Sequence, residues 1–522
     1  MFRQLSSLIA IAGSAAVMAQ ENAVTNAGPA AAQHGATAAA RIEAGEAVAV
    51  DSVAADAIEW MPGERFADYI PADWEPLPAT REPDAAPDAL YGVVGYVEPA
   101  PEGLLDHLEW RLTDDEGAQV AAIEFSSAGA HALRVRFDED FGRDGVELRV
   151  YDPVSGAAFG PYTRPIRDEN GHWWTTPIFG EHIGLEFVAP ATVEAPLLPK
   201  IGAIAYINGD SPFTERGCAH NDVTCVSSWA NEAQAVVELW FIDGNGNVAG
   251  TCSGALLNRT PSDLCPLVMT ANHCIGNQSA ANSTAFIWQF QTPNCNGMPP
   301  NANTLPRSDG SLLLKRYTAS DWNLVGLYEA PGANFFLGWS SGSWSDGAAT
   351  GIHHPGGTFK RISFGSKVDN HEQEFCDASN NCFTAEVWDV EYTSGYTQPG
   401  SSGSPVMDSS RRVRGTLSGG PADCMTSRYG RFDLAFTNLQ YYLSSIASPV
   451  VVTSWAGDPG NNGSLERGTA SNPFSTVFEG SFAVVAGGNV EINPGSYNER
   501  FTIRRPMTLK RRGTSGIVRI GQ

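Results

Sequence analysis

Three short segments of the sequence carry the groups that acyl transfer through a serine requires. Such chemistry needs a hydroxyl nucleophile, a histidine to take its proton, a carboxylate to hold the histidine in one tautomer, and donors for the developing oxyanion. The segments are Thr270-Ala271-Asn272-His273-Cys274, Ser320-Asp321-Trp322-Asn323-Leu324 and Gln398-Pro399-Gly400-Ser401-Ser402-Gly403-Ser404-Pro405. We therefore predict that His273, Asp321 and Ser402 form a catalytic triad.

The order of these three residues along the chain restricts the fold. An α/β-hydrolase runs Ser, Asp, His, and no histidine follows Ser402 in this sequence. The subtilisin order, with Asp first, has no matching motif. Each segment alone has a simpler interpretation: Ser402 in an ordinary Ser/Gly turn, His273 as a core histidine, Asp321 as a surface turn residue. An apolar run from Leu324 to Tyr328 instead places Asp321 at the start of a buried strand, and the three segments together favour the triad.

The motifs G-x-S-G-x-P around Ser402 and T-A-x-H-C around His273 resemble the signature of trypsin and chymotrypsin. Further stretches resemble the bacterial lysyl endopeptidases, namely 250–256, 352–355, 360–363, 419–421 and 429–431. The resemblance implies an all-β fold with a two-barrel chymotrypsin-like protease domain. It also implies that the backbone amides of Gly400 and Ser402 bind the oxyanion.

The resemblance is weaker at the substrate pocket. It assigns the pocket to Tyr396, Ser418, Gly419, Gly420, Asp423 and Ser427. A lysine side chain needs a carboxylate there, because a buried ammonium without a partner is heavily penalised. Lysyl endopeptidases place an Asp where this chain has Ser427, and the other trypsin-type position is Tyr396. Asp423 could supply the charge or could be a surface-loop carboxylate, and Ser418 replaces a family histidine, so cleavage after Lys or Arg is a hypothesis.

Nine cysteines lie between positions 218 and 424, with no CxxC pair and no Cys/His cluster at zinc spacing, which favours disulfides over a metal site. The resemblance implies the disulfides Cys218–Cys424, Cys225–Cys295 and Cys252–Cys274. Cys376 and Cys382 would close a local loop outside the family pattern. Cys265 is then left over, either buried and inert or a free thiol.

We expect no metal and no cofactor. The adjacent His353 and His354 point to opposite faces of a strand and make a poor chelating pair, so we interpret them as structural.

Residues 1–19 have the pattern of a secretory signal peptide, with a basic Arg3, an apolar run from Leu8 to Val17 and small residues up to Ala19. The run is shorter than the roughly 20 residues that cross a bilayer, and no later segment qualifies as a membrane span. We predict a protein secreted from a bacterium.

Composition divides the rest of the precursor into four parts. Residues 20–80 form an Ala-rich, acidic, low-complexity pro-segment. Residues 81–209 have the short alternating runs of a small β-sandwich, interpreted as a pro-domain or, alternatively, as a permanent accessory domain. Residues 210–449 hold every cysteine and form the protease domain. Residues 450–522 are a strand-rich tail with a spacing similar to the first rungs of a β-helix.

The negative charge lies mainly ahead of the protease domain. Of the net charge of −25, residues 20–200 contribute −21, because they hold 32 acidic and 11 basic side chains. This argues against nucleic-acid binding, which needs a basic face. The expected partners are protein or peptide substrates and the chain's own pro-region. Taken with the resemblance, the sequence predicts a secreted serine endopeptidase made as a precursor. The alternatives are an inactive relative that serves as a surface adhesion module and an esterase using the same triad.

Overall fold

The computed structural model describes most of the chain beyond residue 91. The described residues are 44–49, 75–79, 92–113, 117–139, 145–208, 219–260, 262–345, 347–376, 382–421, 423–444, 449–453 and 466–521. The predicted signal peptide, most of the pro-segment 20–80 and Cys218 lie outside them. In the part that is described, none of the helices has the length and apolar character that a bilayer crossing requires.

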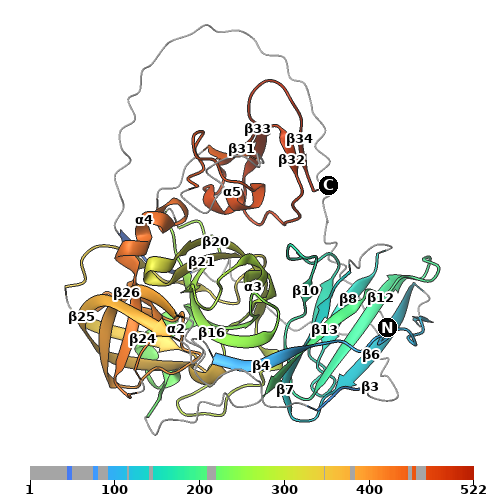
Figure 1. Cartoon of the computed structure of the whole chain (residues 1–522), viewed down its shortest axis with the longest axis horizontal. Helices are drawn as coiled ribbons and strands as arrows, with labels where there is room; N and C mark the ends of the chain where they lie inside the picture. The colour runs from blue at the N-terminus through green and yellow to red at the C-terminus, as the bar shows by residue number, and fades with distance from the viewer. Residues whose placement is uncertain are drawn as a thin grey trace, which may run out of the picture. The chain divides into compact units, whose positions relative to one another are not determined.

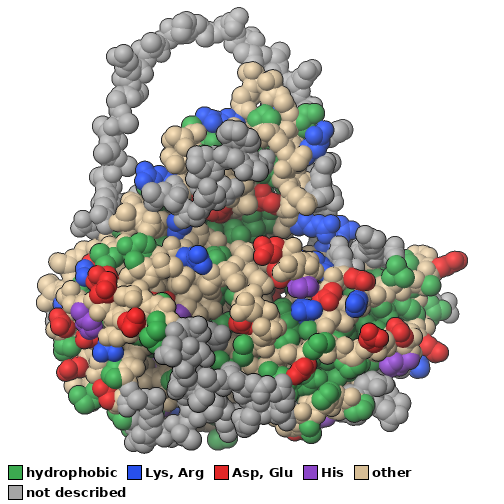
Figure 2. All heavy atoms as spheres, in the orientation of Figure 1, with side chains coloured by type: hydrophobic (Ala, Val, Ile, Leu, Met, Phe, Trp, Pro, Cys, Tyr) green, Lys and Arg blue, Asp and Glu red, His purple; other side chains and the backbone are tan. Residues whose placement is uncertain are grey.

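The first described domain is a sandwich of two β-sheets (Figure 1). One sheet contains β3 (Glu75–Pro76), β5 (Arg111–Leu112), β6 (Ala118–Ser126), β8 (Glu147–Tyr151), β9 (Ala158–Tyr162) and β12 (His182–Pro190). The other contains β4 (Gly92–Pro99), β7 (Ala130–Phe137), β10 (Trp173–Trp174), β11 (Ile178–Phe179) and β13 (Ile201–Asn208). Phe125 and Phe187 of one sheet pack with Phe137 and Ile204 of the other in a common core. Acidic side chains are spread over the outer surface of these strands (Figure 2).

Seven antiparallel strands form the first barrel of the protease region. Their order is β19 (Arg307–Asp309), β18 (Ala285–Ile287), β15 (Val236–Ile242), β16 (Val248–Leu257), β17 (Leu267–Ala271), β21 (Trp322–Leu327) and β20 (Ser311–Tyr317). Gly310, between β19 and β20, joins the two ends of this sheet. Its N–H donates to the Thr284 carbonyl at 2.8 Å, and its carbonyl accepts from the Tyr328 N–H at 3.2 Å.

Six antiparallel strands form the second barrel, and their pairings close a ring. Going round it, the strands are β24 (Ala348–His353), β25 (Arg361–Cys376), β26 (Cys382–Ser394), β29 (Thr426–Arg431), β28 (Val413–Gly419) and β27 (Pro405–Met407), which pairs again with β24. A closed ring leaves no free sheet edge. The expected pair of barrels is therefore present, with β25 and β26 extended into a long hairpin.

Short elements complete the protease region. They are β1 (Ala44–Gly45), β2 (Val48–Ala49), β14 (Asn221–Asp222), α2 (Ala230–Ala235), α3 (Gln278–Ser283), β22 (Phe335–Phe336), β23 (Trp339–Ser340) and α4 (Phe432–Leu443). Five 3-10 turns lie between them, at Val223–Cys225, Ser227–Trp229, Ala302–Thr304, Thr318–Ser320 and Pro355–Gly357.

The tail is a parallel ladder covered by a helix (Figure 1). Its elements are β30 (Val450–Val452), α5 (Val477–Ala483), β31 (Asn489–Ile492), β32 (Gly495–Tyr497), β33 (Thr508–Arg511) and β34 (Val518–Ile520). β30, β31 and β33 pair in parallel, as do β32 and β34, which is the pairing of stacked solenoid rungs. Buried Arg259 of the first barrel holds this unit, because its guanidinium donates to Asp263 and to the Val484 carbonyl.

Two buried carboxyl groups of the tail make its stability depend on pH. Glu479 accepts a hydrogen bond from the Tyr442 hydroxyl of α4 at 3.2 Å, and Glu466 lies beside it. Burial, reinforced by the Glu479 carboxyl, raises the pKa of Glu466 to about 8, and burial also raises the pKa of Glu479. The folded state therefore binds more protons than the unfolded chain between pH 4.5 and about 8.

Stability from this pair is present at low pH and is lost as the pH rises through the folded pKa. We expect Glu466→Gln to remove much of this loss. When the pH is raised from 5.5 to 9, the Tm of wild type should therefore fall by about 3 °C more than the Tm of the variant. Thermal unfolding followed by circular dichroism measures both. Glu491→Gln, at the surface pair with Lys510, is the control. Parallel Tm profiles for Glu466→Gln and wild type would contradict the prediction.

Candidate active site

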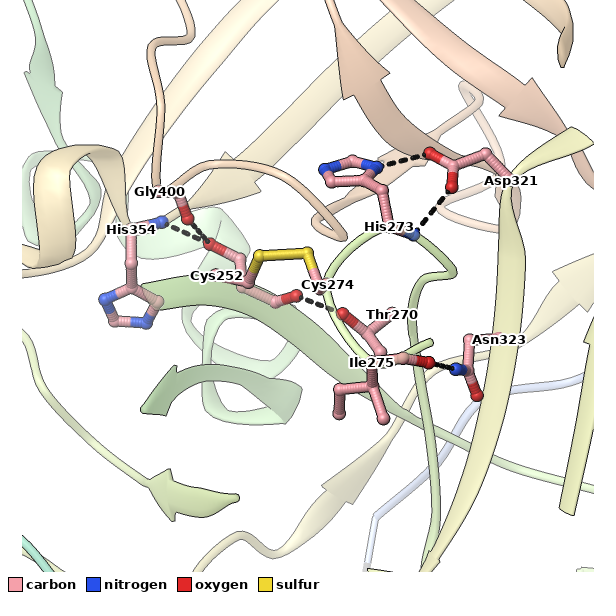
Figure 3. The surroundings of a disulfide bond; sticks show 10 residues. Cys252, Thr270, His273, Cys274, Ile275, Asp321, Asn323, His354 and Gly400 are labelled. Atoms are coloured by element: carbon pink, nitrogen blue, oxygen red, sulfur yellow. Dashed lines mark hydrogen bonds and ion pairs between the residues drawn. A yellow bond between two sulfur atoms is a disulfide. The ribbon is translucent and has the colours of Figure 1, made fainter. Parts of the chain in front are cut away.

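His273 and Asp321 lie side by side because the strands that carry them are paired. β17 ends at Ala271, which pairs with Trp322 at the start of β21. His273 Nδ1 donates to Asp321 Oδ2 at 2.7 Å, and the His273 backbone N–H donates to Oδ1 at 3.0 Å (Figure 3). The two side chains are 4% and 0% exposed. The carboxylate thus fixes the ring orientation and places a proton on Nδ1, which leaves Nε2 as the basic nitrogen.

The far side of the imidazole is enclosed by the β25–β26 hairpin. Phe383 of β26 stacks on the His273 ring with centroids 5.6 Å apart, and Phe375 of β25 stacks on Phe383 at 5.0 Å. His273 Nε2 is buried and has no hydrogen-bond partner among the described residues. In the sequence, the one local sign of this contact is that an aromatic residue, Phe383, follows Cys382.

The segment around Ser402 packs against the residues that precede His273. A Cβ on Gly403 would lie 2.2 Å from the Ser253 carbonyl oxygen and 2.9 Å from the Ala271 nitrogen, so only glycine fits. The Ser402 carbonyl accepts from the Ser253 N–H at 2.7 Å. Ser402 is 3% exposed and lies between Gly400 and Gly403, whose φ angles are +90° and +83°. The structure therefore brings the serine turn to the junction of the barrels where His273 lies.

A disulfide and two hydrogen bonds fix the loop that carries the imidazole. Cys252 of β16 is bonded to Cys274, the residue after His273 (Figure 3). Thr270 Oγ1 donates to the Ser253 carbonyl at 2.9 Å, and Asn323 donates to the Ile275 carbonyl. The base is thus tied to β16 on one side and to β21 on the other.

Two more of the expected disulfides are present in the described structure. The structure contains the disulfides Cys225–Cys295 and Cys376–Cys382. Cys424 is disulfide-bonded, and its expected partner Cys218 lies outside the described residues. Cys265 is a buried free thiol, and burial raises its pKa, which disfavours the nucleophilic thiolate form.

The predicted oxyanion donors lie in a turn whose carbonyls face β16. The Ser253 hydroxyl donates to the Gly400 carbonyl at 3.0 Å, and the Ser253 N–H donates to the Ser402 carbonyl. Among the described residues, the Gly400 N–H donates no hydrogen bond. Both carbonyls are therefore satisfied from the barrel side, and the Gly400 amide stays available.

Ser427, at the position where lysyl endopeptidases have an Asp, is paired with a second hydroxyl, that of Thr397. Ser427 is 1% exposed, and its Oγ lies 2.7 Å from Thr397 Oγ1, a residue that the sequence analysis missed. Buried Tyr396 donates its hydroxyl to Gln398 at 3.1 Å and stacks on His220. Because nothing in the sequence marks residues 30 positions apart as neighbours, the Thr397–Ser427 pair could be found only from the fold.

The remaining predicted pocket residues lie on β28 and in the loop after it. Ser418 is buried, Gly419 faces Phe375 of the hairpin, and Gly420 approaches the Thr426 carbonyl. Exposed Asp423 accepts from the Thr426 N–H at 2.6 Å and the Met425 N–H at 2.9 Å. Desolvation raises its pKa, but these amides outweigh that effect and hold the pKa below its usual value. The Asp423 carboxylate is therefore used within its own loop.

Two clusters in the described part of the chain have the composition of metal sites. They are Cys252, His273 and Cys274, and Glu374, Cys376 and Cys382. The sulfur atoms of both clusters are in disulfides, so neither cluster offers a thiolate.

Comparison with known proteins gives matches over both major domains. Residues 213–434 match the family described as lysyl endopeptidase, C-terminal domain, and residues 94–198 match the lysyl endopeptidase N-terminal domain. A lysyl endopeptidase of Pseudomonas aeruginosa is 28% identical over 415 residues, which cover 71% of this chain and 86% of that protein. The first match spans the segments of His273, Asp321 and Ser402, and the second spans most of the sandwich.

Solved structures of two proteases are similar over a smaller part of the chain. The active form of the Rv3671c protease from M. tuberculosis has 17% identity and a TM-score of 0.31, covering 44% of this chain and 91% of that one. The HtrA-type protease AlgW with a tripeptide has 14% identity and a TM-score of 0.29, covering 41% and 62%.

Proposed function

The chain is a trypsin-like serine endopeptidase close to the lysyl endopeptidases, and we propose that it works through an acyl-enzyme formed on Ser402. In this proposal His273 is the base and then the acid, and Asp321 orients it. The observation that carries the proposal is the 2.7 Å bond from His273 Nδ1 to Asp321, which leaves a buried Nε2 without a partner in the described structure.

The proposed reaction passes one proton through His273 Nε2 in each of its two halves. His273 Nε2 takes the Ser402 hydroxyl proton as Oγ attacks the peptide carbonyl, and the Gly400 and Ser402 amides bind the oxyanion. The imidazolium then gives that proton to the leaving amine as the C–N bond breaks. Water then attacks the acyl carbonyl as the same nitrogen takes its proton. The imidazolium returns that proton to Ser402 Oγ as the acyl C–O bond breaks.

We propose that the pocket favours an uncharged residue before the cut, in contrast to the Lys or Arg expected from the resemblance. A buried ammonium needs a carboxylate partner. Ser427 offers a hydroxyl bonded to Thr397, and the Asp423 carboxylate is held by its own loop. The hypothesis of basic specificity therefore has less support than the resemblance alone suggested.

Cleavage-site mapping on a denatured protein and a peptide library tests both the activity and the pocket. We expect peptide cleavage without enrichment of Lys or Arg before the cut, and we expect Ser427→Asp to raise kcat/KM for Lys over Ala there by at least tenfold, about 1.4 kcal/mol. Ser410→Asp, at an exposed turn, is the matched control. Strong Lys enrichment in the wild-type digest would contradict the pocket proposal, and a digest with no cuts would contradict the activity.

We further propose that the sandwich is a pro-domain that restricts the active site until it is removed. β4 pairs with β13 of the sandwich and also with β16 of the first barrel. It begins at Gly92, where an added Cβ would lie 3.2 Å from the Gly400 nitrogen. A strand of the sandwich thus starts beside the amide that is proposed to bind the oxyanion.

Buried polar contacts support a stable complex between the sandwich and the barrel. Arg134 of β7 is 2% exposed, and its guanidinium donates to the carbonyls of Trp240 and Ser283. The Tyr162 hydroxyl donates to Asp309 at 2.8 Å. Such contacts suit a pro-domain that stays bound as an inhibitor. Secretion, predicted from residues 1–19, agrees with the disulfides, which persist in oxidising compartments.

A further inference from the structure

Residues 353–357 run from the end of β24 into the loop before β25, and three hydrogen-bonded links, one of them through Ser253, join them to the nucleophile turn 399–402. The His353 side chain reaches Ser401, with Nδ1 2.8 Å from Oγ. The His354 N–H donates to the Ser253 hydroxyl at 2.9 Å, and that hydroxyl donates in turn to the Gly400 carbonyl (Figure 3). The Gly356 N–H donates to the Pro399 carbonyl at 2.8 Å. One short segment therefore holds three consecutive residues before Ser402.

The hydrogen bonds around His353 fit a single assignment of donors and acceptors, and this assignment fixes the tautomer of the imidazole. Ser363 Oγ donates to the Tyr396 carbonyl at 3.5 Å, so it accepts from His353 Nε2 at 3.1 Å. His353 then carries its proton on Nε2, and Nδ1 accepts from the Ser401 hydroxyl, which itself accepts from the Gln398 N–H at 3.4 Å. Tyr396 and Ser401 belong to the same loop, so the imidazole connects the two ends of that loop.

The bond to Pro399 sets the direction of the Gly400 amide. The Pro399–Gly400 peptide is planar and trans, so its C=O and N–H point in opposite directions. Because the carbonyl is bonded to Gly356, the Gly400 N–H must point away from the 353–357 segment. Turning this peptide over would break the Gly356 bond and place the Pro399 carbonyl where the oxyanion should bind.

We propose that His353 is a positioning residue, which as a neutral imidazole holds Ser401 and thereby keeps the 399–402 turn in the form that presents the Gly400 amide. This inference rests on the proposed function of Ser402. His353 and Ser401 are both 0% exposed. Burial, aided by nearby His220, lowers the pKa of His353 well below its usual value, so the ring stays neutral.

The proposal has a consequence for the precursor. The three links described above involve no charged group and no chain terminus. These contacts are complete in a chain that still carries the sandwich, so the turn does not need pro-domain removal in order to form.

The test replaces each end of the His353–Ser401 bond in the mature enzyme. His353→Leu and Ser401→Ala are expected to lower kcat about 10²-fold with KM within about threefold, because the oxyanion contact strengthens only in the transition state. Affinity for a peptidyl boronate, which forms a tetrahedral adduct on the serine, should fall in parallel. His353→Asn keeps an acceptor near the Nδ1 position and should recover at least tenfold of the lost kcat.

Folded His353→Leu and Ser401→Ala enzymes with kcat within twofold of wild type would overturn the proposal. So would a loss that appears in KM alone, with boronate affinity unchanged. The double variant should lose no more than the worse single variant if both act through one bond. His371→Leu, in the middle of β25, is the control.

Failure of the proposed function gives a different result. If a fluorophosphonate still labels Ser402→Ala, the nucleophile assignment is wrong whatever His353 does. If that labelling is lost while the His353 and Ser401 variants keep full activity, only the positioning role fails.

Discussion

Ser402→Ala is expected to lower kcat about 10⁴- to 10⁶-fold, because without the hydroxyl there is no acyl-enzyme and only the oxyanion contacts and substrate binding remain. The methyl group fits the space, so the fold should be retained. Peptide turnover and fluorophosphonate labelling, read by intact mass, measure the effect. Ser410→Ala, in the exposed turn before β28, is the control and should be labelled like wild type. A labelled Ser402→Ala protein would contradict the assignment.

The same variant shows how the sandwich is removed. N-terminal sequencing of the secreted protein gives the mature terminus, which we expect between residues 209 and 218, after the last strand of the sandwich. A Ser402→Ala protein that keeps its sandwich indicates self-processing, whereas an unchanged terminus indicates another protease. A sandwich that is retained in the active wild-type enzyme would support the alternative of a permanent accessory domain.

The fold class could be predicted from the sequence because the relevant signals are local. Alternating runs in 118–126, 130–137 and 182–190 form strands of the sandwich, and the tail's regular spacing of short runs corresponds to a parallel ladder. The order His, Asp, Ser depends only on counting along the chain. Local patterns of this kind predict strands without any knowledge of tertiary contacts.

Other parts of the site could not be predicted, because they depend on which distant residues become neighbours. Phe383 lies 110 positions from His273, and only the length of the β25–β26 hairpin brings its ring onto the imidazole. The sequence predicts a structural role for His353, and the fold shows that its imidazole contacts Ser401, which lies 48 positions away. In the sequence alone, both residues look like ordinary strand residues. Their contacts can be seen only in the closed second barrel.

The helix of the tail could not be predicted for a related reason. The sequence of residues 450–522 predicts short strands, but residues 477–483 form the helix α5. Thr476 caps the start of α5 by accepting from the Glu479 N–H at 3.0 Å, and Glu499 accepts from the Val477 and Phe478 N–H groups. Glu499 follows β32 and is distant in sequence from the start of the helix, so this second cap is a tertiary contact. It stabilises a helix where the local sequence favours strands.

Asp321→Asn is expected to lower kcat about 10⁴-fold with little loss of stability. The His273 backbone N–H needs an acceptor at the Oδ1 position, so the amide oxygen of the asparagine must lie there. The amide NH₂ then takes the Oδ2 position and faces Nδ1. A donor facing Nδ1 forces the imidazole proton onto Nε2, and a protonated Nε2 cannot accept the Ser402 proton.

The geometry of the two hydrogen bonds thus predicts a wrong tautomer rather than a lost contact, and the experiment can distinguish these effects. Asp321→Asn should keep a Tm near wild type while fluorophosphonate labelling slows as much as kcat. Asp321→Ala should lose stability as well, because the His273 N–H is left buried without an acceptor. Asp243→Asn is a matched control, since Asp243 also accepts from backbone amides, those of Asn247 and Val248, but has no histidine partner within the described part of the chain. A folded Asp321→Asn enzyme within tenfold of wild-type kcat would show that the carboxylate does not set the imidazole tautomer.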